Sequence, residues 1–340
     1  MQNVLRQRGH DTRLFANESP STIDVFPLSK IRKFLKDPHD ILIYHYSMGW
    51  NIGLELLHDL NCRTVVKYHN ITPPEFFAGL SIDYETVCRQ GREQVKDIAT
   101  ANCDLYLADS QYNAEELIHE GADRSKCVVV APFHHIEKLA QLAPDTSVLD
   151  QYVNSTVNIL MVGRVAPNKG HASLIETLAV YNHQYHGRAR LLIVGKEAPQ
   201  LASYSRWLRQ LATTKGLDGS VVFAGGVSDE QLKAYYLAAD FFMLTSEHEG
   251  FCVPLVEAMA MKVPIIAFAS SAIPATIGDA GLVWQERNPY LLAASIDYLN
   301  RDESLSAALG LMGRRRYEQV FNNDRLAEEF TRALRQAGLI

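Results

Sequence analysis

Short apolar runs rich in Val, Ile and Leu alternate along the chain with amphipathic stretches, and this alternation is typical of βαβ units. A run such as Leu191–Val194 is continuously apolar, which indicates burial on both faces and therefore a parallel sheet covered by helices. Connections in such a sheet are right-handed, so the second half predicts a doubly wound, Rossmann-like layer. Its predicted strands are Val157–Gly163, Arg190–Gly195, Ser220–Ala224, Asp240–Thr245 and Val263–Ala267, and its predicted helices are His171–His186, Leu201–Lys215, Asp229–Ala238 and Pro254–Met261.

The first half repeats this pattern less cleanly. Its predicted strands are Thr12–Ala16, Ile41–Tyr46, Thr64–Tyr68, Asp104–Ala108 and Lys126–Ala131. The segment Ala143–Ser155 has little apolar periodicity and contains Pro144, so we interpret it as the linker between two halves. The prediction is an α/β protein with two Rossmann-like domains facing a cleft, over residues 1–145 and 155–320.

Composition narrows the class of protein. The chain has 340 residues, 47% of them hydrophobic and 21% charged, which excludes a disordered chain, a fibrous repeat and a small disulfide scaffold. A net charge of −6 argues against general nucleic-acid binding. The five cysteines contain no C-x-x-C pair, which favours free thiols. The start of the chain, Met1–His10, is polar and basic, so we expect no signal peptide and a cytoplasmic protein.

Two loops of the second half carry candidate chemistry, because parallel sheets bind ligands at the carboxyl ends of their strands. The loop Gly163–Gly170 places Arg164 and Lys169 between glycines, which suits the oxygens of a phosphate group. It lacks the order of residues in a Walker loop. From spacing alone, a solvated basic turn is an equally good interpretation.

The second loop, Ser246–Met259, follows a predicted strand and runs into a predicted helix. Glu249 falls in the loop and Glu257 about one turn into the helix, so both side chains can line one pocket. Pro254 lies in the first turn, where proline is tolerated, and the free amides there suit an anion. Two glutamates at this spacing are common, so a structural role for them stays open.

These residues carry a resemblance. Residues from about Asn158 to Tyr317 closely resemble the sugar-nucleotide-binding half of GT-B glycosyltransferases of retaining family 4, once called group 1. The matching motifs are G-R-x-x-x-x-K-G from Gly163, Leu191–Gly195, Val222–Gly225, S-x-x-E-G-F-x-x-P-x-x-E-A-M from Ser246, Pro274 and Gly278–Gly281. Many relatives have Gly at the position of Cys252.

The first half fits the acceptor-side domain of the same family. It offers Ile41–Tyr46, then Val65–Asn70, then Ala108–Ser110. By resemblance, His69 matches a catalytic position beside the donor sugar, and a satisfied structural histidine is the alternative. His45 and Asn70 are weaker acceptor-side candidates. The last helix, residues 321–340, is expected to cross back to the N-terminal domain.

The resemblance implies a role for each donor-side residue. Arg164 and Lys169 are expected to bind the diphosphate, Glu257 the ribose hydroxyls and Glu249 a hydroxyl of the sugar. The remaining expected donor-binding residues are Gly163, Gly195, Gly225, Gly250, Phe251, Cys252 and Val253. No D-x-D motif is present, so we expect no metal and no cofactor other than the nucleotide sugar itself. Anomeric configuration is expected to be retained by front-face attack, without a covalent glycosyl-enzyme.

The implied function is transfer of a hexose from GDP-mannose or a UDP-sugar to a glycan, a lipid-linked acceptor or another hydroxyl, in polysaccharide or cell-envelope glycan synthesis. The alternatives are a non-catalytic or truncated nucleotide-sugar-binding protein and a GT-B sugar-nucleotide epimerase. An oxidoreductase would want a G-x-G-x-x-G turn, which neither half has. The basic stretch Ser29–Lys36 suggests peripheral contact with a membrane, and a solvated helix face is its alternative.

Relatives usually begin with a strand, a Gly-rich loop and a helix before a segment like Leu5–Asp11, and this chain begins inside that helix. We therefore expect the N-terminal domain to lack its first β-strand and Gly-rich loop. A start placed too far downstream, or a shortened chain, is one explanation. A compensated natural variant is the other.

Overall fold

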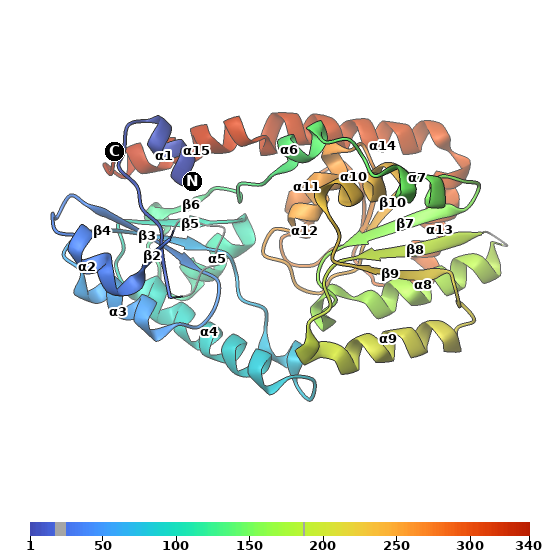
Figure 1. Cartoon of the computed structure of the whole chain (residues 1–340), viewed down its shortest axis with the longest axis horizontal. Coiled ribbons are helices and arrows are strands. Elements are labelled where there is room, and N and C mark those ends of the chain that lie inside the picture. The colour runs from blue at the N-terminus through green and yellow to red at the C-terminus, as the bar shows by residue number, and fades with distance from the viewer. Residues whose placement is uncertain (18–24, 186–187) are drawn as a thin grey trace. The chain divides into compact units, whose positions relative to one another are not determined.

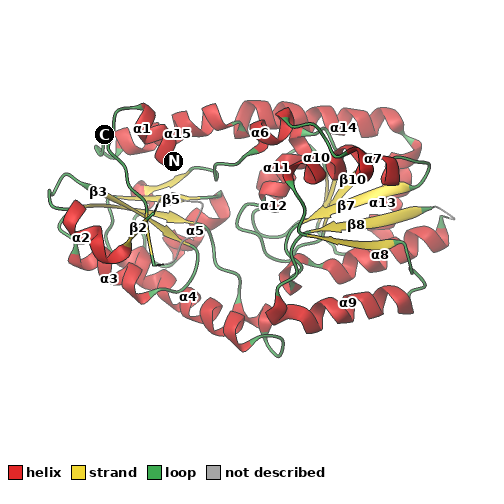
Figure 2. Ribbon diagram, viewed as in Figure 1, coloured by secondary structure: helices red, strands yellow, loops and turns green. Residues whose placement is uncertain are grey.

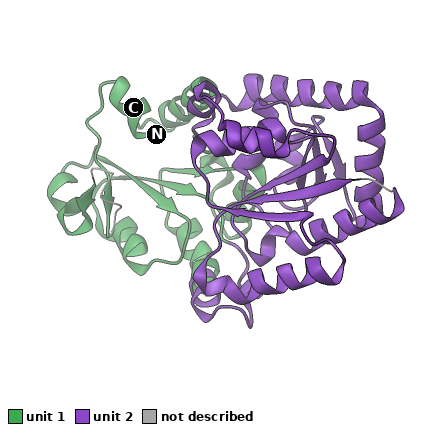
Figure 3. Ribbon diagram, turned by 45° about the vertical axis from the view of Figure 1, so that its right-hand side comes forward, with its two compact units in different colours: residues 1–71, 89–133, 323–340 green, residues 72–88, 134–322 purple. Residues whose placement is uncertain are grey.

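The computed structural model describes residues 1–17, 25–185 and 188–340 (Figure 1). The chain divides into two compact units (Figure 3). Unit 1 comprises Met1–Ile71, Arg89–Phe133 and Asn323–Ile340, and unit 2 comprises Thr72–Cys88 and His134–Asn322. The division passes through one continuous helix, α4 (Ile82–Thr100).

Unit 2 contains a parallel sheet with strand order β12-β11-β10-β7-β8-β9 within the described part of the chain. Counted along the chain, this is the 3-2-1-4-5-6 order of a doubly wound fold. The strands are β7 (Val157–Val162), β8 (Ala189–Val194), β9 (Val221–Gly225), β10 (Phe241–Leu244), β11 (Ile265–Phe268) and β12 (Leu282–Trp284). Both faces are buried because Leu160, Leu191, Leu192 and Phe242 have no exposed surface.

Helices cover both faces of this sheet (Figure 2). The helices of unit 2 are α6 (Ile136–Gln141), α7 (Thr146–Tyr152), α8 (His171–Gln184), α9 (Ala202–Thr214), α10 (Asp229–Ala238), α11 (Val253–Ala260), α12 (Ile273–Ile277), α13 (Pro289–Arg301) and α14 (Glu303–Arg316). The short helical turns are η2 (Pro74–Phe77), η4 (Pro167–Lys169), η5 (Pro199–Leu201) and η6 (Tyr317–Phe321). The predicted helix His171–His186 is α8, and residue 186 lies outside the described residues.

Unit 1 has a parallel sheet in the order β3-β4-β5-β6 and a separate parallel pair, β1-β2, among the residues described. Its strands are β1 (Phe15–Ala16), β2 (Phe26–Pro27), β3 (Ile41–Tyr46), β4 (Arg63–Tyr68), β5 (Leu105–Ala108) and β6 (Cys127–Val129). Its helical elements are α1 (Gln2–Gln7), η1 (Leu28–Lys30), α2 (Ile31–Phe34), α3 (Asn51–Asp59), the later part of α4, α5 (Gln111–His119), η3 (Arg124–Lys126) and α15 (Asn323–Gln336).

The last helix, α15, packs on the sheet of unit 1. Phe330, Ala333 and Leu334 are buried against Val65 and Leu107 in one apolar cluster. Met1, Val4 and Leu5 of α1 contact the same cluster. The two ends of the chain therefore contribute to one core.

The main differences from the predicted elements are local. The proposed linker Ala143–Ser155 contains helix α7, because the Asp145 side chain caps the amide of Ser147 and Val148 and Tyr152 are buried. Contacts also place residues 72–88 and 134–145 in unit 2 rather than with the first half. Strands β2 and β12 were not predicted, since runs of two and three residues carry no readable alternation. The absence of the family's first strand stays a prediction.

Candidate active site

The strand order of unit 2 reverses between β7 and β10. Loops that leave neighbouring strands at such a point run in opposite directions and leave a crevice at the carboxyl edge of the sheet. The loop after β7 is Gly163–Gly170 and the loop after β10 leads through Glu249 into α11. Both predicted donor-side loops therefore lie at the one place where this topology opens the sheet.

Glycine is required where the first loop approaches its neighbours. A β-carbon on Gly195 would lie 1.9 Å from the carbonyl oxygen of Gly163, and one on Gly170 would lie 2.1 Å from the carbonyl oxygen of Thr245. Gly170 also has a φ of +69° and begins α8. These two glycines hold the loop tightly against the ends of β8 and β10.

Lys169 and Glu249 form a close ion pair across the two loops. The Lys169 Nζ lies 2.8 Å from both carboxylate oxygens of Glu249. The two side chains are only 18% and 7% exposed. Burial disfavours the ammonium, but the carboxylate outweighs it and raises the pKa of Lys169. Arg164, in contrast, is exposed.

Hydrogen bonds that involve the backbone also join the same two loops. The side-chain amide of buried Asn168 donates to the carbonyl of His248, and the amide of Glu247 donates to the carbonyl of Asn168. On the other side, the amide of Glu249 donates to Ser271 Oγ over 2.7 Å. Glu249 is thus held by its backbone as well as by Lys169.

Helix α11 begins beside this pair with an unusual residue. Cys252 precedes the helix with φ +75° and ψ +78°, a left-handed conformation that costs a residue with a β-carbon about 1–2 kcal/mol. Pro254 lies in the first turn, as predicted. Burial raises the pKa of the Cys252 thiol, and the Glu249 carboxylate adds to this, which keeps the thiol protonated.

Glu257 lies one turn into α11 and is held by a tyrosine from α10. The hydroxyl of Tyr236 donates to Glu257 Oε2 over 2.7 Å, and Tyr236 is 1% exposed. Burial raises the pKa of Glu257, although the hydrogen bond from Tyr236 partly opposes this shift. The second carboxylate oxygen keeps its capacity to accept hydrogen bonds from a ligand.

The other predicted donor-side residues lie on the same edge of the sheet. Gly225 ends β9, and its carbonyl accepts from the amide of Gly195. Phe251 is buried and packs edge-on against Phe321, while its carbonyl accepts from Thr276. Gly250 precedes Phe251, and Val253 is the first residue of α11.

Unit 1 carries a second polar cluster at the carboxyl edge of its own sheet. His69 Nδ1 lies 2.8 Å from Asp109 Oδ2, and His69 Nε2 lies 2.9 Å from His45 Nδ1. The structure therefore brings the predicted His69 and His45 together. Asn70 points elsewhere: its side-chain amide donates to Asn113 Oδ1 and to Glu116 inside unit 1.

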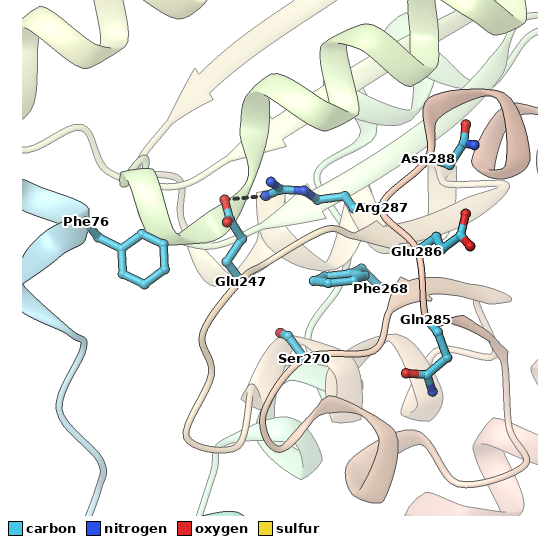
Figure 4. Close-up of a pocket in the computed structure, with 8 residues that line it drawn as sticks. All are labelled: Phe76, Glu247, Phe268, Ser270, Gln285, Glu286, Arg287 and Asn288. Carbon is cyan, nitrogen blue, oxygen red and sulfur yellow. Dashed lines mark ion pairs between the residues drawn. The ribbon is translucent and has the colours of Figure 1, made fainter.

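An open pocket of about 760 Å³ lies over the ends of β11 and β12 in unit 2 (Figure 4). Its lining includes Phe268 and an ion pair between Arg287 and Glu247. Figure 4 shows the Phe268 ring beside this pair. None of the predicted site residues lines the pocket.

Two features are absent from the described residues. Residues 1–17, 25–185 and 188–340 contain no group of three or more His, Cys, Asp or Glu side chains arranged to hold a metal ion. Within the same ranges, no helix combines the length and the apolar character that a bilayer span needs.

Comparison with known proteins places these features in a family. The model of glycosyl transferases group 1 matches residues 153–316, which contain both loops of the crevice, Tyr236 and Glu257. Residues 153–316 are a group 1 glycosyltransferase domain, and the chain has the GT-B fold. The predicted family is confirmed.

Curated relatives of this glycosyltransferase include a D-inositol 3-phosphate glycosyltransferase of Geodermatophilus obscurus, 28% identical over 93% of this chain and 71% of the relative. A GDP-mannose-dependent phosphatidylinositol monomannoside mannosyltransferase of Mycobacterium tuberculosis is 28% identical over 52% of this chain. An O-antigen chain mannosyltransferase B of Escherichia coli is 30% identical over 45% of it. The chain spans 47% and 40% of the lengths of these two mannosyltransferases.

Solved structures agree on the fold. Anabaena HepE in complex with UDP and glucose matches 98% of this chain and 89% of its own, with a TM-score of 0.75 and 20% identity. The GT-B prediction of two Rossmann-like units with parallel sheets is therefore confirmed.

Sequence reasoning did not select several residues that organise the polar clusters of the two units. In unit 2, Tyr236 supports Glu257 and Asn168 joins the two loops. In unit 1, Asp109 contacts His69 and pairs with Lys67. Asp109 and Lys67 lie in segments near strand ends that carry the resemblance, so their position could have indicated that they lie close to His69. Tyr236 lies inside a helix, and nothing in the linear pattern connects it with Glu257.

The strain at Cys252 can be tested by substitution. We expect Cys252→Gly to raise the free energy of unfolding by about 0.5–1 kcal/mol, because glycine adopts this φ without cost and loses part of the gain through its more flexible unfolded state. Cys252→Ala is the matched control, since it removes the thiol but keeps the β-carbon. Chemical denaturation followed by circular dichroism measures both. Equal stability of the Gly and Ala variants would contradict the strain.

Proposed function

We propose that this glycosyltransferase moves a hexose from a nucleotide-diphosphate sugar to a hydroxyl acceptor with retention of anomeric configuration. The observation that supports it best is the Lys169–Glu249 pair at the switch point of the unit 2 sheet, beside Arg164 and the amino end of α11. The cation there suits the diphosphate, the carboxylate suits a hydroxyl of the sugar, and the free amides of the helix suit anionic oxygens.

The diphosphate is the first part to place. Departure of a nucleoside diphosphate concentrates negative charge on the leaving group. A guanidinium about 4 Å away interacts with one unit charge by about 4 kcal/mol at an effective dielectric of about 20, before desolvation is subtracted. Arg164 is exposed and ready for this role. Lys169 directs two of its donors to Glu249, so it contributes its remaining donor and orders Glu249 for a sugar hydroxyl. The protein thereby supplies the positive charge without a metal ion.

Glu257 is proposed to bind the ribose. A carboxylate with one oxygen held by Tyr236 presents the other at a defined position, where it accepts from a hydroxyl. Gly163, Gly195, Gly225, Gly250, Phe251, Cys252 and Val253 are proposed to shape the surrounding wall through their backbone. In unit 1, His69 and His45 are proposed to hydrogen-bond sugar hydroxyls.

GDP-mannose and UDP-sugars are the proposed donors, because one relative is named for GDP-mannose and HepE was solved with UDP and glucose. Glycans or lipid-linked sugars are the proposed acceptors, since the names of the relatives include a phosphatidylinositol mannoside and an O-antigen chain. Work on such acceptors fits a protein at the inner face of a membrane, with the exposed Lys33 and Lys36 near that surface.

A donor screen tests the function. We expect release of the free nucleoside diphosphate from GDP-mannose or a UDP-sugar, stimulated by a hydroxyl acceptor and unchanged by EDTA. The anomeric proton of the product, observed by NMR, should show the configuration of the donor. Tight donor binding with no release would favour a non-catalytic protein, and conversion of the donor into its epimer would favour the epimerase.

Substitution of the diphosphate residues should lower turnover. We expect Arg164→Ala to reduce kcat by about 30-fold, the rate equivalent of about 2 kcal/mol in the transition state. Lys169→Ala leaves Glu249 buried and unpaired, so the double variant Lys169→Ala with Glu249→Gln separates lost chemistry from lost stability. Lys215→Ala, at an exposed position after α9, is the matched control. Near-normal turnover of Arg164→Ala would remove it from the role.

The raised pKa of Glu257 predicts acid sensitivity of donor binding. The ribose-binding form is the carboxylate, so it is lost as pH falls through a pKa that lies above the ordinary value. We expect the donor KM to rise as pH is lowered from about 7 to about 5, with a smaller change in kcat. Tyr236→Phe removes a hydrogen bond that lowers this pKa, so the rise should begin at higher pH. Tyr235→Phe on the same helix is the control. Identical profiles for wild type and Tyr236→Phe would contradict this assignment.

A further inference from the structure

The cluster at the carboxyl edge of the unit 1 sheet contains a buried charge pair that the proposed chemistry does not use. Lys67 and Asp109 have side chains 2% and 7% exposed, and Lys67 Nζ lies 2.5 Å from Asp109 Oδ1. Lys67 Nζ also donates to the carbonyl of Val130. The other carboxylate oxygen of Asp109 contacts His69 Nδ1, and His69 Nε2 contacts His45. Four side chains thus form one continuous chain of contacts.

Parallel pairing explains why these residues meet. His45 of β3 is in register with Lys67 of β4, and Lys67 is in register with Leu107 of β5. His69 and Asp109 follow β4 and β5 directly, and their amides donate to Tyr46 and Tyr68 on the neighbouring strands. Side chains two residues apart on a strand share a face, so Lys67 and His69 lie on the same side of the sheet.

The charges in this cluster decide where the protons lie. Burial alone would raise the pKa of Asp109. The hydrogen bond from His69 and the charge of Lys67 together outweigh burial and lower the pKa below its ordinary value, so Asp109 is a carboxylate. The Lys67 ammonium already neutralises that carboxylate. His69, whose side chain is 28% exposed, would bring a second positive charge to a carboxylate that Lys67 already pairs. A neutral His69 can still donate its Nδ1 proton to Asp109.

The remaining contacts then have only one direction. With its proton on Nδ1, His69 carries a lone pair on Nε2 and accepts from the Nδ1 proton of His45. The outer nitrogen of His45, Nε2, is left with a lone pair, and the His45 side chain is exposed. The two ring planes are 18° apart, which suits a direct bond between them.

We propose that Lys67 and Asp109 are positioning residues: their buried ion pair holds the proton of the neutral His69 imidazole on Nδ1, so that the two histidines present a hydrogen-bond acceptor, His45 Nε2, to a hydroxyl group. This rests on the proposed function, in which these histidines hydrogen-bond sugar hydroxyls. The role of the pair is to set the direction of the outer hydrogen bonds. An imidazolium at His69 would still donate from Nδ1 to Asp109, but it would reverse the bond between the two histidines and turn His45 Nε2 into a donor.

Charged groups of both signs face the two histidines. Lys67 lies on β4 and the amine of Met1 precedes α1, while the Asp109 carboxylate follows β5. Partial burial of its ring lowers the pKa of His45, with His69, Lys67 and the Met1 amine adding to this shift and Asp109 opposing it. His45 is consequently neutral at neutral pH, as an acceptor requires.

NMR of the ligand-free full chain tests the tautomer directly. We expect ¹⁵N-labelled wild-type protein at about pH 7 to show a protonated Nδ1 and an unprotonated Nε2 for His69, and the same pattern for His45. His45→Gln and His69→Gln assign the signals. A His69 ring that is protonated on Nε2 would overturn the proposal, whatever the activity of the enzyme.

Removal of Lys67 distinguishes a positioning role from a merely structural one. In Lys67→Met, Asp109 is left with His69 as its only positive partner, so the imidazolium form of His69 should persist to higher pH than in wild type. Transfer to the acceptor should then fall by about tenfold at about pH 7 in kcat, recover on raising the pH, and leave the donor KM within about twofold. Lys96→Met, exposed on α4, is the matched control.

A second variant keeps the test decisive where Lys67→Met fails to fold. The pair Lys67→Met with Asp109→Asn removes both buried charges together, which proteins tolerate far better than removal of one. We expect this variant to fold and to lose the single tautomer of His69, with both ring forms in its spectrum. An unchanged His69 spectrum in either variant would overturn the proposal. A wild-type enzyme without transfer activity would refute the proposed function but leave the spectra to decide the tautomer.

Discussion

The ion pair between Lys169 and Glu249 is the contact on which the donor side of this protein depends. It joins the loop after β7 to the loop after β10, the two segments that the doubly wound order drives apart. Both partners are largely buried, so each needs the other. The side chain of Asn168 donates to the backbone of this junction and the hydroxyl of Ser271 accepts from it. These contacts hold the two loops in a fixed position relative to each other.

Local strain accompanies this rigidity. Gly170 and Gly195 allow backbone approaches that a β-carbon would block, and Cys252 adopts a left-handed conformation at the start of α11. Such positions persist where the surrounding structure holds them in place. Here they lie next to the ends of β8 and β10 and at the start of α11.

The two units use the same physical device at the carboxyl edges of their sheets. In unit 2 a buried lysine orders a glutamate, and in unit 1 a buried lysine balances an aspartate that holds a histidine. In each case both partners of the ion pair are largely withdrawn from solvent. A buried pair is costly to form, but it defines the position and charge of the groups around it more sharply than an exposed pair could.

Much of this protein could be predicted from its sequence because the signals were local. Continuous apolar runs predicted β3, β4, β7, β8 and β10 closely, and motif spacing selected Arg164, Lys169, Glu249 and Glu257. Alternation and spacing are properties of neighbouring residues, so one chain suffices to read them. Helix α7 was predicted as a linker because its apolar pattern is weak. In the structure, one capping aspartate and two buried residues stabilise the helix despite that pattern.

The partners of these residues were decided only by the tertiary structure. Eighty positions separate Lys169 from Glu249, and twenty-one separate Tyr236 from Glu257. The sequence determined that a cation and a carboxylate follow two strands. The order of those strands in the sheet determined that they touch, because parallel pairing brings the ends of β7 and β10 together. For the same reason the sequence indicated the segments that contain Lys67, His69 and Asp109, but it did not predict that these side chains contact one another.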